Sequence, residues 1–288
     1  MTQNQFQVNE VKRITPFNDL KKIGNDLVTA IGMGTWGIGG RERADYSRDK
    51  ESIEALRYGL DLGINLIDTA EFYGAGHSEE IVGEAIKEYE RDSIFIISKV
   101  WPTNFGYEKA KKAARNSARR LGTYIDLYLL HWPVNEFEKI KETLWALEDL
   151  VDEGIIRYVG VSNFDLELLK RSQEIMRKHE IMANEVKYSI MDRWVENTGL
   201  LEYMERENIA LIAYTPLEKG RLARNPCLAK IGEKYNKTAA QVALNYLIWH
   251  ENVIAIPKAS NKKHLKENFG AMGWRLSEED LKRAKECI

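Results

Sequence analysis

Residues 64–68, 94–99 and 126–131 read INLID, IFIISK and DLYLLH, and each run stays largely apolar until it stops on an ionisable side chain. Runs of this length that are rich in Val, Ile and Tyr are typical of buried β-strands. The same pattern recurs along the whole chain. It predicts eight strands, at residues 27–32, 65–68, 94–99, 125–131, 158–162, 184–187, 209–214 and 253–257.

The segments between these runs have helical periodicity. Their apolar residues repeat at intervals of three and four, as in the two stripes Ile81, Val82, Ala85, Ile86, Tyr89 and Ile140, Leu144, Leu147, Val151. Thr238 with Gln241 has the spacing of a capping box, and Ser277 with Asp280 resembles it. Eight alternating strand–helix units favour a closed (β/α)8 barrel, although an open doubly wound sheet has the same alternation.

No linker rich in Pro or Ser divides the sequence, so we expect a single domain over residues 1–288. Turn-forming residues at 16, 18–19 and 24–25 predict a β-hairpin within an N-terminal extension, residues 1–26, placed to plug the N-terminal end of the barrel. Residues 216–236 predict a long connection that can cover a ligand, and residues 277–287 predict an extra C-terminal helix.

Composition excludes several classes of partner. The formal net charge of −2 gives no basic field for nucleic acid or anionic lipid, and the longest apolar runs are too short to cross a membrane. The first ten residues, MTQNQFQVNE, show neither the cationic nor the apolar region of a secretion signal. Two cysteines, Cys227 and Cys287, are too few for a disulfide framework or a zinc site. We therefore expect two reduced thiols in a cytoplasmic protein that is a monomer or a weak oligomer.

Four residues with reactive side chains fall near the ends of three successive predicted strands. Asp68, Lys99 and His131 each terminate a strand, and Tyr73 follows in the glycine-containing loop AEFYGAG. Catalytic groups of parallel barrels lie at the carboxyl ends of the strands, and adjacent strands are only about 5 Å apart. We expect these four side chains to meet at one site.

These residue types suit hydride reduction of a carbonyl group. The developing alkoxide needs a proton, and Tyr73 can donate one if its pKa, normally about 10, is lowered. A charged Lys99 beside the phenol would lower that pKa, and Asp68 would hold Lys99 in place. His131 can hydrogen-bond the substrate oxygen as charge develops there.

The chain resembles the aldo-keto reductase family over essentially its whole length. The matching segments are GMGTWG (32–37), GINLIDTAEFYG (63–74), SKVW (98–101), LLHWPVN (129–135), GVSNF (160–164), AYTPL (213–217), IPKAS (256–260) and KENF (266–269). The family's catalytic tetrad falls on Asp68, Tyr73, Lys99 and His131. The resemblance implies NADPH-dependent reduction of aldehydes and ketones to alcohols.

The resemblance also implies NADP(H) bound in an extended form along the barrel mouth. Tyr214 matches the residue that stacks on the nicotinamide, Ser162 and Asn163 match the pair that holds its carboxamide, and Lys258 matches the lysine that meets the 2′-phosphate. Further matches to cofactor positions are Gly34, Thr35, Trp36, Glu185, Thr215, Leu217, Ser260, Asn261, His264, Glu267 and Asn268. Trp36, Trp101 and Trp132 match aromatic residues that line the substrate cavity.

Three departures from the family pattern modify this expectation. Glu185 stands where many members have glutamine, and an ionised carboxylate cannot donate to the carboxamide oxygen. His264 replaces an arginine that often clamps the 2′-phosphate, so we expect NADPH preference through Lys258 with some use of NADH. Many members also continue past the last helix into a loop that closes over the substrate, so the resemblance implies a more open mouth and broader substrate acceptance here.

Other interpretations were weighed against this one. Residues 32–37 satisfy the dinucleotide pattern G-x-G-x-x-G, but no helix is expected before about residue 48, as a Rossmann fold requires. Tyr107 and Lys111 have the spacing of short-chain dehydrogenases but lie in a charged segment typical of a solvated helix face. A cofactor-binding redox sensor or regulatory subunit with little turnover remains an alternative. A metal-dependent barrel hydrolase is a minor one, and no metal is expected because its candidate ligands lack a paired-ligand motif: Asp68, Glu71, His77 and Glu79.

Overall fold

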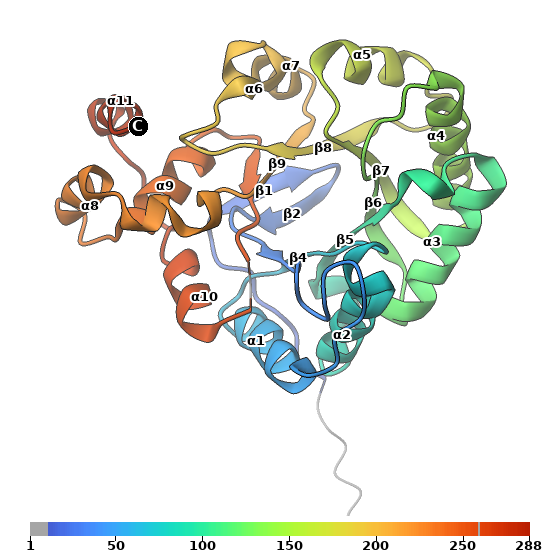
Figure 1. The fold of residues 1–288 in the computed structure, drawn as a ribbon, viewed down its shortest axis with the longest axis horizontal. Coiled ribbons are helices and arrows are strands. Elements are labelled where there is room, and N and C mark those ends of the chain that lie inside the picture. Colours follow the sequence, from blue (N-terminus) through green and yellow to red (C-terminus); the bar gives the residue numbers. More distant parts are fainter. Residues whose placement is uncertain (1–10, 259) are drawn as a thin grey trace, which may run out of the picture.

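The computed structural model describes residues 11–258 and 260–288, and its centre is a barrel of eight parallel strands (Figure 1). Neighbouring strands pair in chain order, and parallel bridges from Ile31 to Ala255 and from Gly34 to Lys258 join the first strand to the last. The closed barrel is confirmed. Its strands are β3 (Met33–Gly34), β4 (Leu66–Asp68), β5 (Phe95–Val100), β6 (Ile125–Leu130), β7 (Ile156–Ser162), β8 (Ile181–Lys187), β9 (Ala210–Tyr214) and β10 (Val253–Ala255).

Helices surround the barrel on its outside (Figure 1). In chain order they are α1 (Asp49–Asp61), α2 (His77–Ile86), α3 (Tyr107–Leu121), α4 (Phe137–Asp152), α5 (Leu166–Glu174), α6 (Trp194–Asn197), α7 (Leu200–Arg206), α8 (Pro226–Glu233), α9 (Ala239–Ile248), α10 (Lys262–Phe269) and α11 (Glu278–Glu286). The predicted caps are present. Thr238 and Gln241 form a capping box at α9, and the Ser277 hydroxyl accepts from the Asp280 amide at α11, the predicted extra helix. None of the helices in the described part of the chain combines the length and apolar character that crossing a membrane requires.

Two apolar layers hold the barrel together. Strand side chains alternate between them, so Leu127 and Leu129 of β6 point into the barrel while Tyr128 and Leu130 pack against the helices. Both predicted helical stripes, on α2 and α4, join the outer layer. The barrel is therefore filled, and only its carboxyl-terminal mouth is left for a ligand.

The N-terminal hairpin plugs the opposite end of the barrel. Strands β1 (Leu20–Ile23) and β2 (Asp26–Thr29) pair antiparallel across a turn in which Gly24 has a φ of 58°. Ile23 and Val28 pack with the inward-facing strand residues. The predicted plug is confirmed, but the predicted strand at 27–32 is wrong. The predicted range merges β2, the second hairpin strand, with β3, the first barrel strand, because only three residues separate the two. Residues 1–10 of the predicted extension lie outside the described residues.

Two further expectations are wrong. Cys227 and Cys287 form a disulfide, with Cα atoms 5.5 Å apart, because the start of α8 and the end of α11 lie side by side. Their separation of 60 residues hides this proximity in the sequence. The predicted loop at 216–236 contains α8, which starts at Pro226 and is capped by the side chain of Asn225.

Candidate active site

The strand register brings the four predicted reactive side chains together at the mouth. Asp68 ends β4, Lys99 lies near the end of β5, and His131 follows β6. Tyr73 starts a 3-10 turn (Tyr73–Gly76) directly after β4, in which Gly74 adopts a φ of 57°. All four are at least nine-tenths buried. The expectation that they meet at one site matches this geometry.

Lys99 is the hub of the cluster. Its ammonium donates to the Asp68 carboxylate, to the Thr69 carbonyl oxygen at 3.1 Å and to the Tyr73 hydroxyl at 3.3 Å. The Glu185 carboxylate, on β8, lies 3.3 Å from the same ammonium. Burial opposes the charge on Lys99, but the Asp68 carboxylate, joined by Glu185 whenever Glu185 is ionised, outweighs burial and raises the pKa of Lys99, so the ammonium stays charged.

Tyr73 departs from the expectation in the direction of its pKa. Burial raises the pKa of Tyr73, and this effect outweighs the lowering by Lys99, while Asp68 and Glu185 raise the pKa further. The predicted net lowering is therefore wrong in the free protein. The Tyr73 phenol remains fully protonated at neutral pH, which is the form that a proton donor needs.

His131 faces Tyr73 across the site, with ring centroids 5.6 Å apart. Burial, together with the charge on Lys99, lowers the pKa of His131 to about 2, so the imidazole is neutral. Its buried Nδ1 atom has no hydrogen-bond partner among the described residues. A neutral imidazole carries one N–H and can donate a hydrogen bond without acting as a strong acid.

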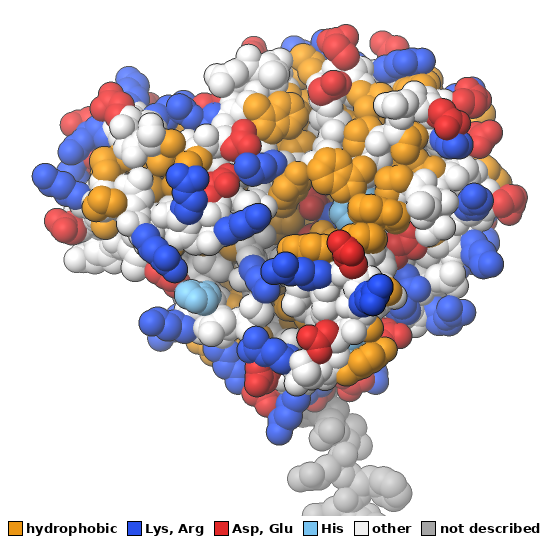
Figure 2. All heavy atoms as spheres, viewed as in Figure 1, with side chains coloured by type: hydrophobic (Ala, Val, Ile, Leu, Met, Phe, Trp, Pro, Cys, Tyr) orange, Lys and Arg blue, Asp and Glu red, His pale blue; other side chains and the backbone are white. Residues whose placement is uncertain are grey.

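Aromatic side chains form the wall of the mouth. Phe72 stacks on Trp101 with ring centroids 3.9 Å apart and lies nearly parallel to Trp36, while Trp101 meets the edge of His131. Trp36 and Trp132 leave about two-fifths of their surface exposed. Figure 2 shows hydrophobic side chains gathered around the hollow at the centre of this face. Phe72 was not among the residues predicted to line the cavity, and its only sign in the sequence is its place before Tyr73.

The residues matched to the nicotinamide form a connected hydrogen-bond chain. The Tyr214 hydroxyl donates to Asn163 Oδ1 at 2.8 Å, and Asn163 Nδ2 donates to the His131 carbonyl oxygen at 3.1 Å. Ser162 donates to the Glu185 carbonyl oxygen. Asn163 and Thr215 have positive φ angles of 63° and 54°, a strained conformation that often marks functional segments.

Glu185 is enclosed with only 3% of its surface exposed. Burial raises its pKa well above the usual value, and the neighbouring carboxylate of Asp68 raises that pKa further. The ionised form considered in the sequence analysis is therefore disfavoured in the free protein.

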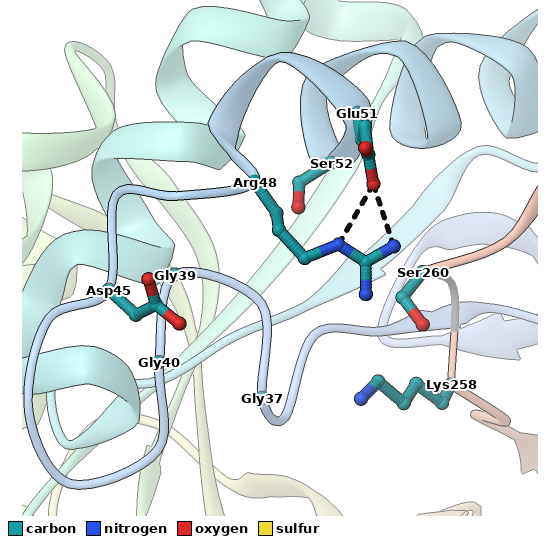
Figure 3. A pocket seen from close by; sticks show the side chains of 9 residues that line it. All are labelled: Gly37, Gly39, Gly40, Asp45, Arg48, Glu51, Ser52, Lys258 and Ser260. Atoms are coloured by element: carbon teal, nitrogen blue, oxygen red, sulfur yellow. Dashed lines mark hydrogen bonds and ion pairs between the residues drawn. The ribbon is translucent and has the colours of Figure 1, made fainter.

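A second pocket lies beside Lys258, between the connection that follows β3 and the start of α1 (Figure 3). Lys258, Ser260, Arg48 and Ser52 line it, and Gly37 forms part of its wall. Burial, with the charges of Arg41 and Arg48, lowers the pKa of Lys258. Asp45 and Glu51 line it too, and Arg48 donates two hydrogen bonds to Glu51, which leaves Lys258 as the lining cation without an ion pair among the described residues. Arg48 was not among the predicted cofactor residues, because it lies some 200 residues from Lys258 in the sequence.

The remaining predicted cofactor positions differ in their contacts. Thr35 is buried and accepts from the Ser78 hydroxyl, and Asn261 uses its side chain to cap α10, so both have internal partners. His264 and Glu267 lie on α10, where His264 Nδ1 is 3.7 Å from the Glu267 carboxylate. Of the others, Gly34 ends β3, Leu217 follows β9, and Asn268 is buried on α10.

The residues of the rival interpretations have separate partners. Gly34 ends β3 and no helix in the described chain starts before Asp49, which differs from a Rossmann turn. Tyr107 and Lys111 lie on α3 and bond to α4 and to Glu153 after it, on the outside of the barrel. The proposed metal ligands are distributed over different contacts: Asp68 with Lys99, Glu71 with the Trp101 amide, His77 with Asp49 and Glu80, and Glu79 with Arg120.

A filled parallel barrel with a buried Tyr–Lys–Asp–His cluster at the carboxyl ends of its strands defines a barrel enzyme. Comparison with known proteins identifies its family. A sequence model of the Aldo/keto reductase family matches residues 30–288. Methylglyoxal reductase YeaE of Escherichia coli (strain K12) is 39% identical over 265 residues, which cover 90% of this chain and 90% of that protein.

Solved structures agree with the sequence match. A thermostable aldo-keto reductase in complex with the inhibitor epalrestat gives a TM-score of 0.89 at 42% identity, over 93% of this chain and 99% of that one. An aldo/keto reductase from Klebsiella pneumoniae in complex with NADP and acetate gives 0.85 at 36% identity, over 94% and 95%. The chain belongs to the aldo/keto reductase family and is an oxidoreductase.

Proposed function

We propose that this protein reduces aldehydes and ketones to alcohols with NADPH, and that Tyr73 is the general acid. The observation that carries the proposal is the buried contact between the Tyr73 hydroxyl and the Lys99 ammonium, opposite His131 at the barrel mouth. This arrangement holds a proton donor, a charge stabiliser and a hydrogen-bond donor around one point. Such a set suits a carbonyl oxygen that becomes an alkoxide.

The bound cofactor supplies the hydride, and the protein supplies the proton. Because burial raises the pKa of Tyr73, the phenol keeps its proton until a stronger base, the substrate alkoxide, forms beside it. Lys99 then stabilises the phenolate that remains, and Asp68 holds Lys99 in place. The neutral imidazole of His131 donates a hydrogen bond to the carbonyl oxygen and orients it. Solvent returns a proton to Tyr73 after the alcohol leaves.

The residues at the mouth fit a nicotinamide cofactor with a 2′-phosphate. Tyr214 presents a half-buried ring beside Asn163, as a stacking platform next to an amide. The Lys258 ammonium lies in the positive field of Arg41 and Arg48, and an anion there would relieve the repulsion. This position of Lys258 supports the proposed preference for NADPH. Some use of NADH is expected, because His264 is exposed and does not replace a guanidinium clamp.

We further propose small carbonyl compounds as substrates. The aromatic wall of Trp36, Phe72 and Trp101 offers apolar contact, while His131 and Tyr73 are the polar groups of the cluster that face the reacting oxygen. The similarity to a methylglyoxal reductase supports α-oxoaldehydes as members of this class.

Location and assembly complete the proposal. We also propose that the protein is cytoplasmic and that it is a monomer or associates weakly. The disulfide bears on the location, because such cross-links are rare in reducing compartments outside hyperthermophiles. Titration of free thiols in freshly lysed cells checks whether Cys227 and Cys287 are joined there.

The test is NADPH oxidation in the presence of 4-nitrobenzaldehyde, with the alcohol product quantified. We expect one alcohol formed per NADPH consumed. Binding of NADPH, followed by fluorescence, without turnover of this or of an α-oxoaldehyde would overturn the proposal in favour of a sensor or regulatory subunit.

A further inference from the structure

Glu185 lies next to the catalytic cluster. Strand β8 places its carboxyl group 3.3 Å from the Lys99 ammonium, which also binds the Asp68 carboxyl group. Both carboxyl groups and the ammonium are at most 3% exposed. The buried Oε2 atom of Glu185 has no hydrogen-bond partner among the described residues.

The charges in this cluster do not balance if both carboxyl groups are ionised. The titratable groups that face Glu185 are Asp68 on β4, Lys99 on β5, Tyr73 after β4 and Tyr214 on β9. On β7 its register partner is the uncharged Ser162. Tyr73 and Tyr214 are neutral phenols, so Lys99 is the single cation for two carboxylates. A buried, uncompensated carboxylate is costly, so the pair is expected to keep one proton.

The ammonium of Lys99 also has more acceptors than hydrogens. Its three N–H groups donate to Asp68, the Thr69 carbonyl oxygen and the Tyr73 hydroxyl, and Glu185 Oε2, although only 3.3 Å away, receives no hydrogen bond from it. An ionised Glu185 would compete with Tyr73 for the positive charge. A protonated Glu185 would not, and its O–H can donate to Asp68.

We propose that Glu185 is a positioning residue that holds a proton throughout reduction, shares it with Asp68, and so directs the charge of Lys99 toward Tyr73. The inference rests on the proposed reductase function and adds a residue to it. Burial and the adjacent Asp68 act in the same direction, since both raise the pKa of Glu185. Loss of the Glu185 proton at alkaline pH should therefore weaken stabilisation of the Tyr73 phenolate and slow turnover.

The test compares the pH dependence of kcat for wild type and Glu185→Gln. The amide has the same shape, is always neutral and can donate to Asp68, so Glu185→Gln has no acidic proton to lose as pH rises. The alkaline decline of wild type should shift to higher pH in Glu185→Gln. Glu196→Gln is the matched control, since Glu196 accepts hydrogen bonds from Tyr188 and Tyr246 away from the mouth. Superimposable pH profiles for wild type and Glu185→Gln would overturn the proposal.

A second readout does not depend on turnover. In protein labelled with ¹³C at glutamate side-chain carboxyl carbons, the resonance absent from Glu185→Gln identifies Glu185. We expect that resonance at the position of a protonated acid at neutral pH, moving only under alkaline conditions. An ionised Glu185 at neutral pH would overturn the proposal even if the protein is an active reductase. A protonated Glu185 in a protein without turnover would instead place the failure in the proposed function.

Discussion

The two ends of the barrel bury charged groups in opposite ways. At the amino end, Asp126 of β6 accepts from Arg91, from Arg157 and from the Ile96 amide, at 2.5 to 2.9 Å. At the carboxyl end, Lys99 contacts two carboxyl groups, and buried atoms of Glu185 and His131 have no hydrogen-bond partner among the described residues. The same barrel thus satisfies its charges where it is plugged and leaves them under-satisfied where it opens.

The difference indicates what each end is for. A fully paired buried carboxylate stabilises one arrangement and offers nothing to a ligand. An under-satisfied cluster costs stability but keeps hydrogen-bonding capacity and perturbed pKa values for chemistry. Substitutions at the two ends should therefore separate activity from stability.

The largest effect of the comparison is a loss of kcat on substitution of Lys99, which contacts the other charged groups at the mouth. Lys99→Met removes the charge that stabilises the Tyr73 phenolate, and kcat should fall by about 10²–10³-fold. Steady-state kinetics with a saturating aldehyde measures it. Lys111→Met is the control, because Lys111 pairs with Glu153 outside the barrel and should leave kcat unchanged. Wild-type kcat in Lys99→Met would remove Lys99 from the mechanism.

At the amino end the expected effect is on stability alone. Asp126→Asn weakens charge-assisted hydrogen bonds to Arg91 and Arg157, so the free energy of unfolding should fall by about 1.5–3 kcal/mol. Denaturant unfolding measures that loss, and kcat should stay at the wild-type value below the transition. A large loss of kcat in the folded variant would contradict the claim that the amino end of the barrel contributes to stability and not to activity.

Lys258 should discriminate between the two cofactors. Lys258→Ala removes the ammonium from the pocket shared with Arg48, and the Kd for NADPH should rise by about 10–100-fold, corresponding to a lost charge-assisted hydrogen bond. The Kd for NADH should hardly change. Fluorescence titration with both cofactors measures the two values, and equal losses would mean that Lys258 does not contact the phosphate.

The smallest predicted effect is a pH dependence of stability at the mouth. The folded-state pKa of Glu185 is raised above its ordinary value of 4.5, so its contribution is complete below that pH and is lost as pH rises through the folded pKa. Unfolding free energies of wild type and Glu185→Gln should therefore diverge toward alkaline pH, with wild type losing more. Parallel curves would show that Glu185 is ionised in the folded protein.

Much of the site at the barrel mouth was predictable, because the ends of its strands can be recognised in the sequence. Asp68, Lys99 and His131 each interrupt an apolar run, and parallel strands bring such ends to one rim. The hairpin was predictable as a plug but not in its bounds, since only three residues separate its second strand, β2, from the first barrel strand, β3.

The parts that failed depend on distances that sequence spacing does not contain. The Cys227–Cys287 disulfide and the pocket between Arg48 and Lys258 join segments far apart in the chain. The net pKa direction of Tyr73 depends on how completely it is buried, which outweighs the neighbour that its spacing suggested.

The central claim, that Tyr73 donates the proton, is tested most directly by Tyr73→Phe. The change removes only the hydroxyl, so kcat for aldehyde reduction should fall by about 10²–10⁴-fold, the usual contribution of a general acid. The Kd for NADPH and the unfolding free energy should remain close to wild type. A Tyr73→Phe protein that reduces aldehydes at the wild-type rate would contradict the account.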